Sequence, residues 1–171
     1  PRAPRCAEQF AEAFEAAGAP KALVTAIHCS YAVSEELVAH PLAGYVSFTG
    51  SVFGGRRIYQ AVANSRFIDV GLELGGKDPL LVLGDADIPK AARFAASNSF
   101  RNAGQVCVST ERIYVHQDIA DAFIEHLVQA TEAYEPHEGT VSGVRMGPMI
   151  NRRQRSHVLD HIQEAVDSGA R

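Results

Sequence analysis

Cysteine is scarce in this chain, which contains only Cys6, Cys29 and Cys107. Three is an odd number, and no two of these residues form a Cys-x-x-Cys pair, so the pattern argues against a disulfide framework and a structural zinc site. A reducing compartment is the expected location, and we predict a cytoplasmic protein. Because the chain opens at Pro1 without a methionine or a leader segment, an organelle matrix stays open as the alternative.

Long hydrophobic runs and an excess of basic residues are also missing. The longest apolar run, around residues 80–83, has the length of a strand, whereas a membrane-spanning helix needs about 20 apolar residues. The formal net charge is −4, and the lysine and arginine residues are scattered along the chain. We therefore expect neither a membrane nor a nucleic acid as a partner. The hydrophobic content of 46% fits a globular protein.

The common short motifs for nucleotides and catalytic zinc are absent as well. Residues 50–55 are followed by Arg56 and Arg57 where a Walker A loop has lysine and then serine or threonine, and they do not match Gly-x-Gly-x-x-Gly. The segment nevertheless follows an expected strand and opens an expected helix, where free N–H groups attract anions such as a pyrophosphate. A purely structural turn is the alternative. His157 and His161 lie four residues apart without a third ligand nearby in the sequence, so we predict no metal site.

Helical and extended patterns alternate along the first half of the chain. Apolar residues recur at steps of three and four near the start, and short apolar runs follow between glycine, proline and capping residues. Because the last strand contains runs of apolar residues, we expect a parallel sheet that is buried on both faces. The expected elements are a helix at 6–17, a strand at 23–28, a helix at 34–39, a strand at 45–49, a helix at 51–63 and a strand at 67–74. In this scheme Cys6 and Cys29 are packing residues without chemistry.

The second half continues the same alternation. Asp87 and Pro89 have the character of an N-cap and a first-turn residue, so a helix is expected from there to residue 102. The other expected elements are a strand at 79–83, a strand at 111–116, a helix at 119–130, a loop at 134–144 and a helix that begins near residue 151. We expect Val158, Ile162 and Val166 of that last helix to face inward.

Cys107 and Glu73 are the two strongest candidates for catalytic residues. Cys107 ends the polar and glycine-containing segment Asn102-Ala-Gly-Gln-Val-Cys107, in which backbone N–H groups can approach a substrate oxygen closely. Glu73 interrupts an apolar strand, where a carboxylate is costly unless it turns into a solvated cleft. A thiolate can attack a carbonyl, and a carboxylate can activate water to cleave the resulting thioester. The alternatives are a buried small hydrophobe at Cys107 and a surface position at Glu73.

Three segments together resemble the NAD(P)-dependent aldehyde dehydrogenase superfamily. They are Phe48-Thr-Gly-Ser51 with Gly55, then Leu72-Glu-Leu-Gly-Gly-Lys77, and then residues 100–107 with Arg112. The resemblance implies an α/β fold in which residues 1–76 form the C-terminal half of a Rossmann-like dinucleotide-binding domain. Residues 77–171 would then begin an α/β catalytic domain that carries the thiol. Members of the family are much longer, so the chain resembles a central segment.

The resemblance also implies a role for each site residue. Cys107 is the nucleophile that attacks an aldehyde, and Glu73 activates the water that releases a carboxylic acid. The implied contacts of an NAD or NADP cofactor are Gly50, Ser51, Gly55 and the main chain at Leu74. Val52 departs from the threonine that is commoner in the family. The family also implies a homo-oligomer for the full-length form.

One alternative function keeps the fold, and in it coenzyme A, phosphate or another nucleophile receives the acyl group in place of water. Glu73 argues against this alternative, because relatives that acylate coenzyme A often lack that base. The second alternative is of a different class, in which the chain is a catalytically inactive binding or structural relative, or a fragment that associates with a longer subunit.

For the oxidation that the resemblance implies, we expect residues 1–171 alone neither to bind the cofactor well nor to turn over, because other implied cofactor and oxyanion contacts have no matching position here.

Overall fold

The structure is a computed structural model that describes residues 3–140 and 142–170. The chain divides into two compact units, Pro1–Leu74 and Gly75–Arg171. Each unit combines helices with a short parallel sheet, which confirms the predicted α/β class.

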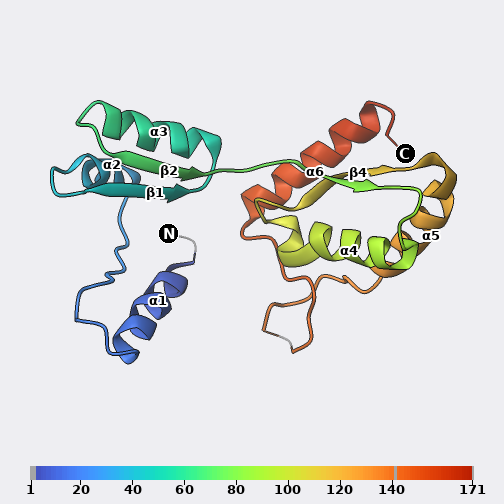
Figure 1. Cartoon of the computed structure of the whole chain (residues 1–171), viewed down its shortest axis with the longest axis horizontal. Coiled ribbons are helices and arrows are strands. Elements are labelled where there is room, and N and C mark those ends of the chain that lie inside the picture. The colour runs from blue at the N-terminus through green and yellow to red at the C-terminus, as the bar shows by residue number, and fades with distance from the viewer. Residues whose placement is uncertain (1–2, 141, 171) are drawn as a thin grey trace. The chain divides into compact units, whose positions relative to one another are not determined.

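The first unit is built around a β-α-β segment. Strands β1 (Tyr45–Thr49) and β2 (Asp69–Glu73) pair in parallel over their whole length, and helix α3 (Val52–Ala63) connects them (Figure 1). Helices α1 (Pro4–Ala16) and α2 (Tyr31–Ala39) precede this segment. The two predicted strands and the predicted helix at 51–63 are therefore confirmed, although β2 is shorter than expected because residues 67, 68 and 74 lie outside it.

The core of the first unit lies on one face of this sheet. Val46 of β1 packs against Ile58 and Val62 of α3, and all three side chains are buried. Residues on the other side of β1 stay open, as shown by the 60% exposure of Tyr45. The expectation of a sheet buried on both faces is therefore wrong for the part of the chain that the structure describes. In the described part of the first unit, α3 covers the strands and is supported by Val38 of α2.

Three expectations for the start of the chain are also wrong. Residues 23–28 form no strand within the described chain, since a strand needs a partner for its backbone groups and none pairs there. Helix α2 begins one turn earlier than predicted, because Ser30 and not Ser34 supplies the N-cap oxygen, which accepts from the N–H of Val33. Helix α1 buries none of its described residues, and Cys6 is exposed.

The second unit repeats the pairing of two parallel strands. Strand β3 (Asp78–Val82) pairs with β4 (Thr110–Val115), with an irregularity in register between Asp78 and Pro79. Helix α4 (Ile88–Phe100) and the single turn η1 (Arg101–Gly104) connect the strands. The chain then continues through η2 (Gln117–Ile119), α5 (Ala120–Thr131) and α6 (Arg152–Asp167). Residue 141 of the predicted loop at 134–144 lies outside the described residues.

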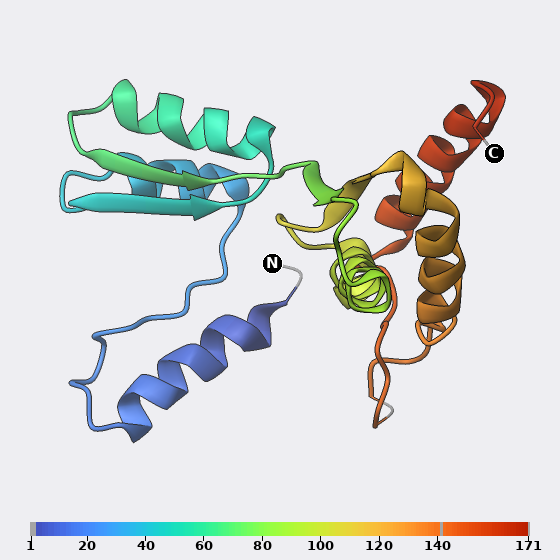
Figure 2. The ribbon, with the colours of Figure 1, turned by 45° about the vertical axis from the view of Figure 1, so that its right-hand side comes forward.

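Helices α4 and α5 lie side by side under one face of this second sheet (Figure 2). The buried cluster consists of Val82, Ala92, Ala95 and Phe123. As predicted, Asp87 is the N-cap of α4, where its carboxylate accepts from the N–H of Lys90 at 3.0 Å.

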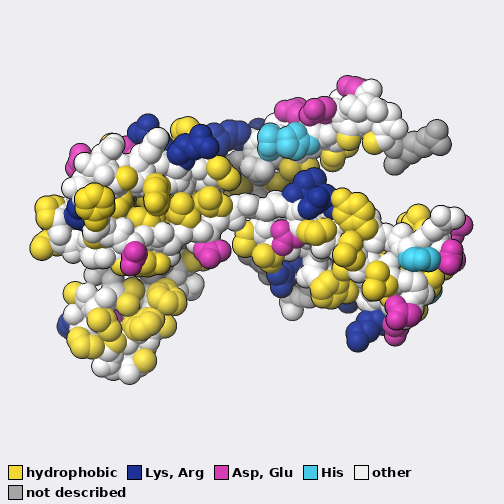
Figure 3. Space-filling model, turned by 45° about the horizontal axis from the view of Figure 1, so that its top comes forward, with side chains coloured by type: hydrophobic (Ala, Val, Ile, Leu, Met, Phe, Trp, Pro, Cys, Tyr) yellow, Lys and Arg dark blue, Asp and Glu magenta, His cyan; other side chains and the backbone are white. Residues whose placement is uncertain are grey.

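Helix α6 begins where predicted, but its apolar side does not face a core. Val158, Ile162 and Val166 are 38%, 55% and 56% exposed, so their predicted inward orientation is wrong. Hydrophobic side chains are visible on the surface of both units (Figure 3). In the described ranges, no helix combines the length and apolar character that crossing a membrane requires.

Candidate functional site

Most residues of the predicted cofactor site gather at the carboxyl end of β1 and β2. The N–H of Gly50 donates to the carbonyl of Glu73 at 3.0 Å, which extends the pairing of the two strands by one residue. Ser51 is the N-cap of α3, and its hydroxyl accepts from the N–H of Gly54 at 3.1 Å. The carboxyl end of a parallel sheet next to a helix N-terminus is where α/β proteins commonly bind nucleotides.

Gly55 and Leu74 bring the helix and the end of β2 into close contact. A methyl group added at Gly55 would lie 2.7 Å from Cδ2 of Leu74, so the absent side chain at Gly55 lets α3 pack there. Gly50 is similarly close, because an added Cβ would lie 2.6 Å from the ring of Phe48.

These residues fit the phosphate part of a dinucleotide. The first N–H groups of a helix have no acceptor within the helix, and Ser51 occupies only one of them. The remaining donors and the dipole of α3 favour an anion at an exposed glycine turn.

Glu73 is the last residue of β2, opposite Thr49 in the register. Strand alternation places it with Asp69 and Gly71 on the face that α3 does not cover. Its side chain is exposed and has no hydrogen-bond or ion-pair partner within the described chain. A carboxylate in this setting is free to accept a proton from water.

Cys107 lies in an exposed turn between η1 and β4. Three successive residues before it have positive φ, with Asn102 at 54°, Ala103 at 56° and Gly104 at 71°. The backbone N–H of Cys107 has no acceptor among the residues described here. Its carbonyl lies against Gly76, where an added Cβ would be 3.1 Å from the oxygen. The absent side chain at Gly76 therefore allows the chain to pass close to this turn.

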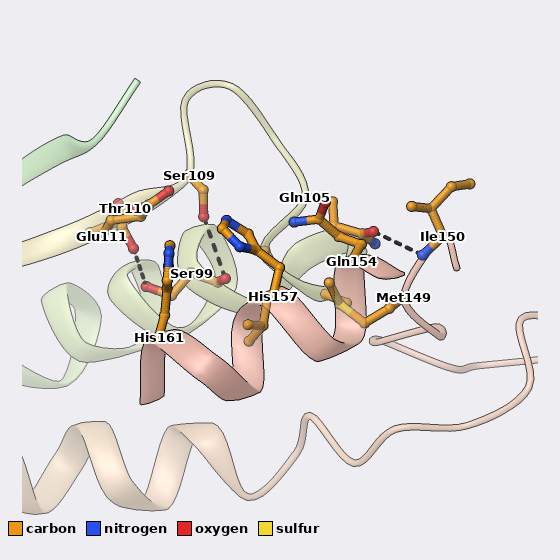
Figure 4. A pocket seen from close by; sticks show the side chains of 13 residues that line it. Ser99, Gln105, Ser109, Thr110, Glu111, Met149, Ile150, Gln154, His157 and His161 are labelled. Carbon is orange, nitrogen blue, oxygen red and sulfur yellow. Dashed lines mark hydrogen bonds between the residues drawn. The ribbon is translucent and has the colours of Figure 1, made fainter. Parts of the chain in front are cut away.

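Polar side chains fix both sides of the Cys107 turn. On one side, the amide of Gln105 bonds to Asn102 and, through Oε1, to the N–H of Ile150. On the other side, the buried hydroxyl of Ser109 donates to the carbonyl of Asn98 at 3.2 Å. Gln105 and Ser109 line a groove of about 580 Å³ that reaches the first turns of α6 (Figure 4). The sequence marked Gln105 only as part of the polar segment that ends at Cys107, and nothing in the spacing of Gln105 or Ser109 indicated these partners.

The predicted residues thus fall into two groups, one in each unit. Glu73, Gly50, Ser51, Gly55 and Leu74 belong to the first unit. The second unit holds Cys107.

The remaining cysteines and the histidine pair have simpler surroundings. Sγ of Cys29 lies 3.3 Å from the hydroxyl of Ser34. Cys6 is exposed, as Cys107 is, so its predicted packing role is wrong. The rings of His157 and His161 lie 4.1 Å apart between centroids and are tilted by 56°, and no cluster of three metal-binding side chains occurs among the described residues.

A β-α-β segment with a glycine turn, followed by an exposed cysteine turn on a second α/β unit, defines a class of α/β proteins suited to nucleotide binding and thiol chemistry. Within that class, the sequence profile described as the aldehyde dehydrogenase family matches residues 1–171, and the chain belongs to this family.

Individual relatives agree with this assignment. A betaine aldehyde dehydrogenase of Brucella anthropi is 38% identical over 167 residues, which is 98% of this chain and 34% of the relative. The NADP(+) succinate-semialdehyde dehydrogenase GabD of Escherichia coli K12 is 39% identical, over 98% of this chain and 35% of the relative. The solved structure of an NAD-dependent aldehyde dehydrogenase from Sinorhizobium meliloti is similar with a TM-score of 0.87 and 31% identity, over 94% of this chain and 32% of that one. The chain therefore spans about a third of the length of the curated relatives it matches.

Proposed function

We propose that this chain carries the nucleophile, the base and part of the cofactor site of an enzyme that oxidises an aldehyde to a carboxylic acid with NAD or NADP. The observation that carries the proposal is the exposed Cys107, whose turn is anchored on both sides while its own N–H has no acceptor among the described residues. A thiol next to an uncommitted donor suits a reaction in which a carbonyl oxygen becomes negative. The relatives are named as dehydrogenases of aldehydes, and the proposal extends this activity to the present chain.

The first step belongs to Cys107. Its thiolate sulfur attacks the carbonyl carbon of the aldehyde, a C–S bond forms, and the electron pair of the carbonyl moves to the oxygen. The N–H of Cys107 donates to that oxyanion, which stabilises the thiohemiacetal. NAD or NADP, when bound, supplies the hydride acceptor that converts this adduct to a thioester. The residues that would hold the cofactor are Gly50, Ser51, Gly55 and the main chain at Leu74.

The second step belongs to Glu73. Its carboxylate takes a proton from water, and the water oxygen attacks the carbonyl carbon of the thioester. The C–S bond then breaks, the carboxylic acid leaves, and the sulfur of Cys107 keeps the electron pair as a thiolate. The exposure of Glu73 at the end of β2 supports this role because water can reach the carboxylate.

The wider assignment follows the same reasoning. We infer that residues 1–76 belong to the dinucleotide-binding domain and residues 77–171 to the catalytic domain, which is supported by the division of the chain between Leu74 and Gly75. We also infer a cytoplasmic homo-oligomer for the full-length form. The odd set of unpaired cysteines and the exposed apolar side chains support these two inferences.

Alkylation tests the role of Cys107 without any cofactor. We expect iodoacetamide at neutral pH to modify Cys107 at least about tenfold faster than Cys6, since activated thiols differ from ordinary ones by such factors or more. Cys6 is the matched control because it is also exposed. Mass spectrometry of the cysteine-containing peptides measures both rates in one sample, and equal rates would contradict the proposal.

Acylation by an activated ester tests Glu73. Transfer of the acyl group to Cys107 releases the alcohol and forms the thioester without an oxidation step. We expect Glu73→Gln to prolong the lifetime of acyl-Cys107 by about a hundredfold, the usual scale of a lost general base. Asp69→Asn is the control, because Asp69 lies on the same face of β2 and is also exposed. If the Glu73→Gln and Asp69→Asn chains deacylate at the same rate, Glu73 is not the base.

A further inference from the structure

Gln105 is bonded at both ends of its side-chain amide. Nε2 donates to the carbonyl of Asn102 at 2.9 Å, and Oε1 accepts from the N–H of Ile150 at 2.9 Å, a residue 45 positions further along the chain. The amide of Asn102 returns a bond to the carbonyl of Gln105 at 3.0 Å. Figure 4 shows the Gln105 side chain aimed at the backbone of Ile150.

This reciprocal pair closes a loop whose backbone is unfavourable by itself. Asn102 and Ala103 both have left-handed φ values, at 54° and 56°, which cost free energy for residues other than glycine. Such a conformation persists only where surrounding bonds impose it. The Asn102–Gln105 bonds impose it locally, and the bond to Ile150 ties the loop to the segment that starts α6.

The bond to Ile150 also connects parts that otherwise pack sparsely. Helix α6 buries none of its described residues, so the polar link at its N-terminal side is a principal constraint between it and the Cys107 turn. Beyond the turn, the buried Ser109 provides the second anchor through the carbonyl of Asn98. Cys107 thus lies between two fixed points, and its N–H points to no acceptor in the described residues.

We propose that Gln105 is a positioning residue of the Cys107 turn, which it holds against the start of α6 so that the thiol and the free N–H of Cys107 keep one orientation. This inference rests on the proposed function, because it concerns the reactivity of the same thiol. Gln105 acts on the thiol through the backbone of residues 102–107 and not through contact with the substrate.

The experiment compares Gln105→Ala with the unchanged chain. Amide hydrogen exchange, followed by NMR, reports the bond at the N–H of Ile150, and the ratio of the alkylation rates of Cys107 and Cys6 reports the orientation of the turn. We expect Gln105→Ala to accelerate exchange at Ile150 and to lower the ratio, each by roughly fivefold, the scale of one hydrogen bond. Cys6 is exposed and lies in the other unit, so it serves in the same sample as the internal reference for an ordinary thiol.

Two further variants keep the test decisive if Gln105→Ala folds poorly. Gln105→Glu can still accept from Ile150 but cannot donate to Asn102, so we expect slow exchange at Ile150 together with a lowered ratio. Gln154→Ala is the control, because Gln154 lines the same groove and its side chain has no hydrogen bond within the described chain. We expect it to change neither reading.

The outcomes separate the two proposals. If the unchanged chain shows equal rates at Cys107 and Cys6, the proposed function fails. If Cys107 is fast and stays equally fast in Gln105→Ala and Gln105→Glu, only the positioning role fails. An identical decrease in Gln154→Ala would also overturn that role, because the effect would then belong to the groove in general.

Discussion

Glu8 shows how a single half-buried residue can link two segments of the first unit. Its carboxylate accepts from Nε2 of His28 at 2.9 Å and from Arg5 at 2.8 Å. The hydrogen bond from His28, and then the one from Arg5, lower the pKa of Glu8 below its ordinary value of 4.5. The Glu8–His28 bond joins α1 to residues 25–30, which have no regular structure in the described chain.

The lowered pKa gives a pH dependence of definite sign. Because the carboxylate is favoured in the folded chain, its contribution is fully present above pH 4.5 and is lost as the pH falls through the lower folded pKa. We expect an NMR titration of Glu8 to show a midpoint below 4.5, and His28→Ala to move that midpoint upward. His40→Ala is the control and should leave the midpoint unchanged. An unshifted midpoint in the unchanged chain would show that the bond does not form in solution.

For single residues, the sequence predicted the chemical role of a side chain better than its contacts and its exposure. The potential of Cys107, Glu73 and the glycine turn at Gly50 could be stated from residue type and neighbours alone. The partners of Gln105 could not, since Ile150 is brought to it by folding over 45 residues. The exposure of Cys6 was also unpredictable, because an apolar helix face indicates burial only if another element covers it.

Among the elements, those with strong local signals were predicted well. Strand β1, helix α3 and the cap at Asp87 appear where expected, because a strand bounded by turn residues and a capped helix carry their information locally. The strand expected at 23–28 failed for the opposite reason, since a strand requires a partner that the local sequence does not contain. The predicted end of α4 was also wrong. The helix was expected to reach residue 102, but it ends at Phe100, before the left-handed residues of η1.

The cap of α4 supplies the prediction at this scale. Asp87 satisfies the N–H of Lys90, and α4 contributes Ala92 and Ala95 to the core of the second unit. We expect Asp87→Ala to lower the free energy of unfolding by about 1 kcal/mol, which urea denaturation followed by circular dichroism measures. Asp85→Ala removes a carboxylate from the same exposed turn without a cap bond in the described residues and should change stability little. Equal losses in both variants would assign the effect to charge and not to the cap.

On the scale of the whole molecule, the sheets are the limiting feature. In the described residues each unit has a sheet of two strands, covered on one face only. Two paired strands are only marginally stable without further packing. Large side chains such as Phe67, which is fully exposed, and Leu81, which is 67% exposed, show how much apolar surface these units leave uncovered.

This architecture predicts that the chain by itself neither binds the cofactor tightly nor turns over. A complete dinucleotide site combines two mononucleotide-binding halves, and the first unit contains one β-α-β segment in the residues described. We expect calorimetric titration of residues 1–171 with NAD or NADP to show an affinity weaker than micromolar, and ultraviolet absorbance to detect no steady formation of reduced cofactor with added aldehyde. The alkylation test on Cys107 should still succeed in the same sample, because the turn is built within the second unit alone. Micromolar binding with continuous turnover would instead mean that one β-α-β segment and the Cys107 turn are sufficient for the reaction.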